Sequence, residues 1–300
     1  MLVRVDGIGD ALACTPLIAA LRDAGHSVSA VLTTRNAEIF APRTFERVHV
    51  LERIPWPKHG YTQQTWEPAL ADAKVAHYDI ALVASEEPQA YTFARLAGIP
   101  QRVGFHNGWQ KPFKSWWARR ELTAAIDRPA AQPSRPRHEV ETLFQLGRGL
   151  HSEQYPTKER NRLRSLILEQ EIEPSGAQVV QVTSKWLSPK RTPEVVRAWL
   201  GKLGAHGWSG LCARSEQELG KELGERAALQ MRYCDSVVDW KNVIAGAAHL
   251  LTPDTGAAHV AGMVGVRCTD LFETRNYEAQ VRQWAPWATV CTIAEFPDAG

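Results

Sequence analysis

Apolar residues in this chain form short runs that alternate with segments of helical periodicity. The runs Leu2–Val5 and Asp79–Ala84 are nearly unbroken, as in strands of a parallel sheet that is covered on both faces. Between them, apolar side chains recur at helical spacing from Leu12 to Leu21, and Gly25 provides a natural helix end. This order predicts the beginning of an α/β domain with a parallel sheet.

The rest of the first half continues the alternation. Further strands are expected at Val28–Thr33, Val48–Leu51 and Arg102–Phe105, and further helices at Gln89–Ala97 and His138–Leu150. The segment Asp127–Arg137 holds three prolines and is expected to be a loop. The pattern predicts one doubly wound domain over residues 1–155.

A second series begins at Val179, after a polar stretch at Ser152–Pro156 that we interpret as the start of the connection between domains. Its expected elements are the strand Val179–Thr183, helix Pro193–Leu203, strand Gly210–Ala213, helices Glu216–Leu229 and Trp240–Ala248, strand His249–Thr252, helix Ala257–Val264 and strand Val266–Phe272. Three hundred residues suit two domains better than one core. The sequence therefore predicts a second α/β domain over 156–300, with a cleft between the two.

Composition narrows the functional classes. The chain is 44% hydrophobic and 23% charged with a formal net charge of +2, so it is not a general polyanion binder. Its five cysteines form no CxxC pair, which argues against a zinc site and a disulfide framework and favours a reducing compartment. No apolar run reaches membrane-span length, and the charged N-terminus does not resemble a signal peptide. We expect a cytoplasmic protein.

The most informative stretch is the turn that follows the strand His249–Thr252. It contains Asp254, Thr255 and Gly256, and a helix of small residues begins directly after it. Such a turn directs backbone N–H groups and the positive end of a helix dipole at one spot, which suits a phosphate. His259 lies one turn into that helix, where it is either a ligand contact or a packed core residue. A sugar-nucleotide site needs both features, namely backbone N–H groups that bind phosphate and polar side chains beside them.

Asp10 closes the first strand–helix turn, where α/β proteins commonly place chemistry. A carboxylate there is suited to act as a general base on a hydroxyl, and the alternative is a helix N-cap. The turn contains Gly7 and Gly9, but Leu12 stands where a dinucleotide fingerprint would have its third glycine. This argues against an NAD-binding oxidoreductase.

Two groups of basic residues provide further candidate sites. Ser184, Lys185, Lys190 and Arg191 follow the strand Val179–Thr183, where cations could neutralise a diphosphate; the alternative is a solvated basic loop. A second group interleaves aromatic and basic side chains and comprises Trp109, Lys111, Phe113, Lys114, Trp116, Trp117, Arg119 and Arg120. Such a patch suits anionic lipid headgroups, a phosphorylated sugar or single-stranded nucleic acid, or else forms a packed helix with a charged outer face. Nothing else in the chain indicates nucleic acid.

These segments together resemble glycosyltransferase family 9, the bacterial heptosyltransferases of lipopolysaccharide core assembly. The motifs that carry the resemblance are Gly9-Asp10 with Thr15-Pro16; Leu96–Pro100 with Arg102–Phe105 and His138–Glu141; Ser184 with Lys190, Arg191 and Pro193; and Asp254–Gly256 with His259 and Leu271-Phe272. Their order and spacing extend over nearly the whole chain. The resemblance implies a GT-B fold, in which two Rossmann-like domains have the active site between them.

The resemblance also implies a reaction: inverting, metal-independent transfer of heptose from ADP-heptose to a sugar hydroxyl of the lipopolysaccharide inner core, with no cofactor. Asp10 matches the catalytic base. The residues that match or are assigned to donor binding are Ser184, Lys190, Arg191, Glu218, Asp254, Thr255, Gly256 and His259, and those assigned to the acceptor are Arg119, Arg120 and His138. The expected acceptor is phosphorylated lipid A–core, which would bring the protein to the inner face of the cytoplasmic membrane.

Several positions depart from the family pattern. Arg267 replaces a proline, Glu273 replaces a glycine and Thr192 replaces an aromatic residue. The chain is also expected to stop soon after its last strand. The alternatives are therefore a GT-B transferase for another nucleotide sugar and surface glycan, or a catalytically silent sugar-nucleotide-binding protein on the same scaffold.

Overall fold

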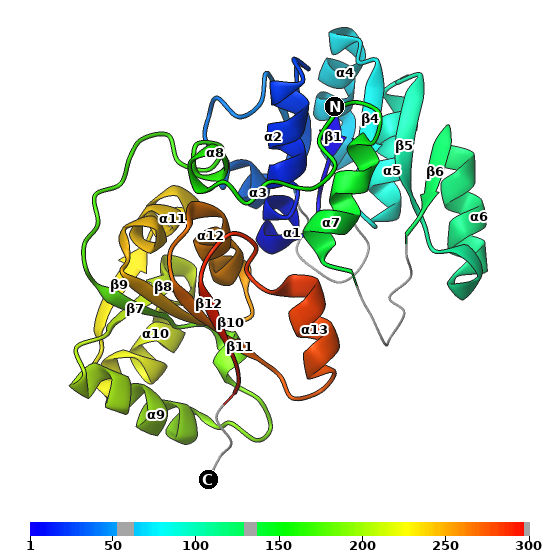
Figure 1. Ribbon diagram of the computed structural model, residues 1–300. Helices are drawn as coiled ribbons and strands as arrows, with labels where there is room; N and C mark the ends of the chain where they lie inside the picture. Colours follow the sequence, from blue (N-terminus) through cyan, green and yellow to red (C-terminus); the bar gives the residue numbers. More distant parts are fainter. Residues whose placement is uncertain (53–62, 129–136, 297–300) are drawn as a thin grey trace. The chain divides into compact units, whose positions relative to one another are not determined.

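A computed structural model describes residues 1–52, 63–128 and 137–296. The chain divides into two compact units, Met1–Lys158 and Glu159–Gly300, and each has its own sheet. The sequence placed the boundary after residue 155. Of the loop expected at Asp127–Arg137, residues 129–136 lie outside the described part of the chain. Figure 1 labels the helices and strands of both units.

Unit 1 contains a six-stranded parallel sheet in the order β3-β2-β1-β4-β5-β6. Its strands are β1 Leu2–Val3, β2 Ala30–Thr33, β3 Val48–Leu51, β4 Ile80–Val83, β5 Gln101–His106 and β6 Ala124–Asp127. Its helices are α1 Ile8–Leu12, α2 Thr15–Asp23, α3 Thr34–Ala37, α4 Gln63–Ala76, α5 Pro88–Leu96, α6 Pro112–Glu121 and α7 Glu139–Phe144, with 3₁₀ turns at Gly108–Gln110 and Gln145–Gly147.

Unit 2 repeats this topology, with strands in the order β12-β11-β10-β7-β8-β9, all parallel. The strands are β7 Gln178–Gln181, β8 Ser209–Ala213, β9 Gln230–Cys234, β10 His249–Pro253, β11 Cys268–Phe272 and β12 Cys291–Glu295. The helices are α8 Arg160–Arg164, α9 Pro193–Ala205, α10 Gln217–Leu223, α11 Val237–Gly246, α12 Gly256–Val264 and α13 Tyr277–Trp284, with 3₁₀ turns at Ser184–Trp186, Arg214–Glu216 and Glu225–Ala227.

Both sheets have the strand order of a doubly wound Rossmann fold. In unit 1 the winding reverses between β1 and β4, and in unit 2 it reverses between β7 and β10. In open sheets of this kind, ligands bind outside the carboxyl ends of the strands at this switch point. Asp10 follows β1 and Asp254 follows β10. The topology thus places both residues, each within its own unit, where ligand chemistry is expected.

Each sheet is covered by helices on both faces (Figure 1). In unit 1 the side chains of Val3, Val31 and Val83 pack with aromatic residues of α4 and α5 into one buried core. In unit 2, Val180, Val182 and Leu271 pack with residues of α9 and α10, and helix α12 is buried over nearly its full length on the opposite face. The unbroken apolar strands are therefore explained by burial on both sides.

Two expected helices are shorter than the sequence indicated. The helix expected at His138–Leu150 ends at Phe144 and tightens into a 3₁₀ turn. A Cβ at Gly147 would lie 2.5 Å from a methyl group of Leu17, so the glycine permits α2 to approach this turn closely. The helix expected at Glu216–Leu229 is α10 followed by a 3₁₀ turn, with Gly224 between them.

The expected order of unit 2 was incomplete at both sheet edges. Strand β9 was missed because its exposed and half-buried residues alternate and include Arg232. Helix α13 and the last strand β12, which follow β11, were also missed. Both missed strands lie at sheet edges, where the apolar signal is weak. Within the described ranges, no helix has the length and apolar character to cross a bilayer.

Candidate functional site

Asp10 is held at both carboxylate oxygens. It is the third residue of α1; its Oδ2 accepts a hydrogen bond from the Gly7 amide (3.1 Å) and its Oδ1 accepts one from Arg4 Nη2 (2.7 Å). The N-cap is therefore Gly7, and the alternative in which Asp10 is the N-cap was wrong by three residues, although the Asp10 carboxylate does accept from the cap amide. Its side chain remains 32% exposed. This geometry combines a fixed orientation with an open surface.

Arg4 is the cation around which the carboxylates at the carboxyl edge of the unit 1 sheet are arranged. It was not identified from the sequence. Its side chain is buried, with Nε 3.2 Å from Asp6 Oδ2 and Nη2 3.9 Å from Glu139 Oε1. Its guanidinium also donates to the Ala84 carbonyl at the end of β4. Burial lowers the pKa of Arg4, but the surrounding carboxylates outweigh this effect and raise it. Arg4 therefore ties together β1, β4 and the first turn of α7.

The ion pairs continue from Arg4 across the edge of unit 1. Glu139 is buried and also accepts from Arg128 Nη2 (2.7 Å), while Arg128 Nη1 lies 2.6 Å from Glu86. Glu86 in turn pairs with Lys114 on α6 at 3.1 Å. Burial raises the pKa of Glu86, but the two cations outweigh it and lower the pKa. The result is an alternating charge network that orders the loops at the carboxyl ends of the strands.

The residues assigned to an acceptor lie in different parts of this unit. His138 is the N-cap of α7, and its Nδ1 accepts from the Val140 amide (3.2 Å). Arg119 Nη2 lies 3.3 Å from His106 Nε2, and the Arg120 guanidinium lies 4.9 Å from the centre of the Trp116 ring. Within the described ranges, no hydrogen bond or ion pair joins either arginine to Asp10. Their acceptor role stays a prediction.

In unit 2, the turn after β10 forms an organised helix start. Thr255 is the N-cap of α12, where its Oγ1 accepts from the Ala257 amide (3.3 Å) and lies 3.0 Å from Thr252 Oγ1. The first amides of a helix, beginning with Gly256, have no acceptors inside that helix. Lys185 Nζ donates to the main-chain carbonyl of Asp254 and lies 4.0 Å from its Oδ2. Backbone amides and the exposed ammonium group of Lys185 therefore lie together at the carboxyl edge of the unit 2 sheet.

The other residues assigned to the donor are placed differently. His259 is 8% exposed, and its ring packs edge-on against Trp284 at a centroid distance of 5.8 Å, as a packed residue would. Ser184 is exposed at the start of the 3₁₀ turn after β7. Glu218 is 88% exposed on α10 and pairs with Lys221 (2.9 Å). Its link to a nucleotide stays a prediction.

Lys190 and Arg191 are neighbours in sequence with opposite surroundings. Lys190 is exposed and forms no hydrogen bond or ion pair with any described residue. Arg191 is buried: its Nη2 lies 2.5 Å from Glu273 Oε1, its Nε donates to the Trp186 carbonyl (3.1 Å), and its guanidinium stacks 3.8 Å from the Phe296 ring centre. Glu273, one of the departures from the pattern of the family that the sequence resembles, is therefore the partner of Arg191.

A second buried acid that the sequence did not suggest lies beside this edge. Asp270 on β11 is fully buried, and neither of its carboxylate oxygens accepts a well-formed hydrogen bond from a described residue. Burial, followed by the charge of Asp254 and by Cys291, raises its pKa well above the usual value, and Lys185 only partly opposes this. The neutral acid is thereby favoured. An acidic residue in the middle of a strand with no other charged residue was the available signal.

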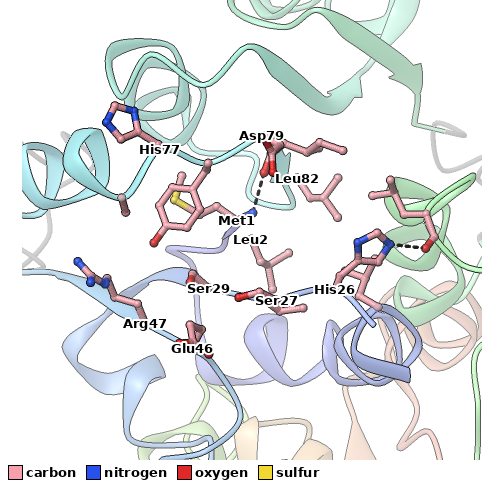
Figure 2. A pocket seen from close by; sticks show the side chains of 16 residues that line it. Met1, Leu2, His26, Ser27, Ser29, Glu46, Arg47, His77, Asp79 and Leu82 are labelled. Carbon is pink, nitrogen blue, oxygen red and sulfur yellow. Dashed lines mark hydrogen bonds between the residues drawn. The ribbon is translucent and has the colours of Figure 1, made fainter. Parts of the chain in front are cut away.

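The described residues also contain a pocket of about 370 Å³ in unit 1. Figure 2 shows its lining, which includes Leu2, His26, Ser29, Arg47 and Asp79. These residues lie where β1, β2 and β4 begin, so the pocket is at the sheet edge opposite to Asp10. It is not the site that the sequence predicted. No group of three or more potential metal ligands is found among the residues that the structure describes.

No family model matches the sequence, and no curated protein matches it. Solved structures do match. The E. coli heptosyltransferase WaaC with ADP is 17% identical with a TM-score of 0.71, over 99% of this chain and 92% of that one. A glycosyl transferase family 9 protein from Veillonella parvula is 14% identical with a TM-score of 0.70, over 98% and 85%. E. coli ADP-heptose lipopolysaccharide heptosyltransferase II is 16% identical with a TM-score of 0.66, over 98% and 90%.

These similarities extend over nearly the whole chain and establish its fold. The expected GT-B fold, with two Rossmann-like domains in one chain, is confirmed.

Proposed function

We propose that this protein is a family 9 glycosyltransferase that transfers heptose from ADP-heptose to a sugar hydroxyl of the lipopolysaccharide inner core. The observation that carries the proposal is Asp10: a carboxylate oriented by Arg4 and the Gly7 amide, partly exposed, at the switch point of unit 1. The solved structures with this fold include heptosyltransferases with ADP and with an ADP-heptose analogue, which supports the same substrate class here.

In the proposed reaction, the donor diphosphate binds at the start of α12. The amides of Thr255 and Gly256 face the phosphates, and Lys190 and Lys185 offset their charge. Asp10 accepts the proton of the acceptor hydroxyl while that oxygen attacks the anomeric carbon. The bond from the anomeric carbon to the diphosphate breaks, and ADP leaves with the electron pair. No metal is needed, because backbone amides and lysines stabilise the leaving group.

Lys185 is one of the basic residues that follow the strand β7, and the proposal includes it among the donor residues. It contacts the Asp254 carbonyl and thereby holds the turn that begins α12. Arg191 contributes differently from Lys190, because Glu273 already pairs with its guanidinium. In the proposal, Arg191 shapes the loop after β7, while the free ammonium of Lys190 meets the diphosphate.

The proposal is tested by Asp10→Asn. The amide keeps the size of the side chain but cannot act as a base, so turnover should fall about 10²–10⁴-fold. ADP affinity, measured by calorimetry, should stay within about twofold of the wild-type value, because the donor residues lie in unit 2. Asp127→Asn is a matched control, since that carboxylate also lies at a carboxyl strand end of the same sheet but is 77% exposed and outside the Arg4 network. Normal turnover in the Asp10 variant would overturn the proposal.

The donor is identified by thermal shift with ADP, UDP, GDP and CDP. A ligand at 100 times its Kd adds about 2.7 kcal/mol of stability, so the correct nucleotide should give the largest shift. ADP is the expected result, and a larger shift with UDP, GDP or CDP would favour a transferase for another nucleotide sugar.

One observation favours a second candidate, a sugar-nucleotide-binding protein without transfer activity. Glu273 puts a carboxylate beside a cation of the expected donor loop, where the family pattern has glycine. Nucleotide binding without donor hydrolysis or transfer would support this candidate.

A further inference from the structure

One helix of unit 1 presents aromatic side chains to solvent. Trp109, Phe113 and Trp116 are 95%, 87% and 61% exposed. Phe113, Trp116 and Arg120 follow the spacing i, i+3 and i+7, which puts them on one face of α6, and Trp109 lies in the 3₁₀ turn Gly108–Gln110 just before that helix. We call these three aromatic residues the aromatic stripe. A surface helix normally directs polar residues outward, so the stripe needs an explanation.

The stripe is held on a firm base. On the inner face of α6, Ser115 and Ala118 are buried, and Trp117 packs edge-on against Tyr91 with ring centroids 5.6 Å apart. Ser115 Oγ donates to the Gly108 carbonyl (2.9 Å) and accepts from the Asn107 amide (3.1 Å), which ties the 3₁₀ turn to the helix. The inner face of α6 therefore provides the packing contacts within unit 1. The outward aromatic residues are not needed for that packing.

The charges beside the stripe are mainly positive. Lys111, Arg119 and Arg120 are exposed around it. The nearby acids are neutralised, because Glu121 pairs with Arg95 at 2.7 Å and Glu86 pairs with Lys114 and Arg128. Asp127 is the remaining exposed acid in this segment. Residues 101–128 carry six Lys/Arg against two Asp/Glu, whereas the whole chain is nearly neutral. A partner for this face would therefore be both apolar and anionic.

We propose that the aromatic stripe docks unit 1 on an anionic phospholipid bilayer. Aromatic side chains on the outward face of a helix favour the boundary between headgroups and acyl chains, and flanking Lys and Arg residues attract acidic headgroups. The inference extends the proposed function by naming the surface from which a lipid-linked acceptor would be taken. It does not depend on transfer activity, because the bilayer contact is made by the aromatic stripe and its flanking cations.

A bilayer fits this face better than single-stranded nucleic acid. Base stacking uses aromatic groups that lie along a positively charged groove. Here the largest exposed fractions belong to Trp109 and Phe113, which stand at the outer surface of the helix. Elsewhere among the described residues, the large exposed apolar side chains are Val48, Val50, Val75, Tyr155, Val238 and Val290. None of those positions combines several aromatic residues with a cluster of cations.

The test is sedimentation of the full protein with lipid vesicles. We expect binding to phosphatidylcholine vesicles that contain phosphatidylglycerol, weaker binding to phosphatidylcholine alone, and loss of binding as salt is raised. The variant Trp109→Ser/Phe113→Ser/Trp116→Ser should bind at least about tenfold more weakly. Val48→Ser/Val50→Ser is the matched control, because it removes exposed apolar side chains from the opposite edge strand of the same sheet.

Each alternative outcome overturns the inference. Equal vesicle binding by the triple variant and the wild type would show that the stripe does not insert. No binding by the wild type, or stronger competition by a single-stranded oligonucleotide than by vesicles, would also contradict it, as would a dimer that dissociates in the triple variant. The ADP thermal shift of the triple variant should equal that of the wild type. Loss of vesicle binding with a normal ADP shift is the expected result, because it shows that the variant still folds and binds nucleotide. Absence of vesicle binding by the wild type together with a normal ADP shift would be a failure of this inference and not of the proposed function.

Discussion

The carboxyl edges of the two sheets share one topology but differ in their electrostatics. In unit 1 the buried cation Arg4 is surrounded by Asp6, Asp10 and Glu139, so its charge is satisfied inside the fold. In unit 2 the exposed ammonium of Lys190 has no partner among the described residues, and the helix start at Thr255 offers amides. The same fold therefore holds carboxylates in place in unit 1 and presents hydrogen-bond donors and a cation to an external anion in unit 2. This difference suits a base in unit 1 and a diphosphate in unit 2.

The largest expected effect comes from removing Arg4. In Arg4→Met, the carboxylates of Asp6 and Asp10 lose this cation and the buried Glu139 keeps only Arg128, so we expect the free energy of unfolding to fall by about 3–5 kcal/mol. Denaturant unfolding measures this change. Arg95→Met is the control, because its pair with Glu121 is 46% exposed on the arginine side and should contribute at most about 1 kcal/mol. Equal losses in the two variants would show that Arg4 does not organise the edge.

The sequence could not reveal which charged residues are buried at these two edges. The first apolar run contains Arg4, and a charged residue in a strand does not show which carboxylates will surround it. The burial of Asp270 was equally hard to predict, because its strand resembles any buried strand apart from this one acid. Asp10, Thr255 and His259 could be named as candidates because turn chemistry and motifs depend on local sequence, and their roles stay predictions. Their contacts, such as the Arg191–Glu273 pair, depend on residues far apart in the chain.

The same limit explains which elements were found. Strands buried on both faces, such as β4 and β10, have continuous apolar sequences and were predicted within one or two residues. Edge strands β9 and β12 have mixed sequences, because most of their side chains are exposed or half-buried. The exposure of Trp109 was not predictable, because the sequence alone fits a packed helix equally well.

The second prediction concerns the pH dependence of stability at the unit 2 edge. Burial raises the pKa of Asp270 above its unfolded value of 3.8. The stability that this group contributes is therefore fully present below pH 3.8 and is lost as the pH rises through the folded pKa, by about 1.4 kcal/mol per pH unit. Asn does not titrate, so the stability of Asp270→Asn relative to wild type should increase with pH.

Unfolding free energies of both proteins between pH 4 and 8 measure this trend. Asp254 and Cys291 support the raised pKa and Lys185 opposes it, so Lys185→Met should extend the dependence to higher pH. A difference between wild type and Asp270→Asn that stays constant with pH would show that Asp270 is ionised in the folded protein.

The third prediction separates the two neighbouring cations. Lys190→Ala should leave stability within about 0.5 kcal/mol, because the side chain is exposed and has no described partner. The same variant should weaken ADP binding about tenfold, because a charge-assisted contact to phosphate is lost. Arg191→Ala should show the reverse order, with stability affected more than ADP affinity, because it removes the stack on Phe296 and the pair with Glu273. Calorimetric titration and denaturant unfolding of both variants measure the contrast.

The smallest expected effect comes from Glu273→Gly, which restores the residue of the family pattern. Glu273 is 50% exposed, so breaking its pair with Arg191 should lower the unfolding free energy by at most about 1 kcal/mol. Removing this carboxylate frees the Arg191 guanidinium and makes the loop after β7 more positive. Near a solvent-exposed diphosphate such a charge change is worth about 1 kcal/mol, which corresponds to about fivefold tighter ADP binding.

Glu278→Gln on α13 serves as the charge control, because it removes an acid from the same unit without freeing Arg191. Tighter binding in the Glu273 variant alone would mean that unit 2 restrains one of its own cations; equal affinity in both variants would leave Lys190 and Lys185 as the cations that meet the diphosphate.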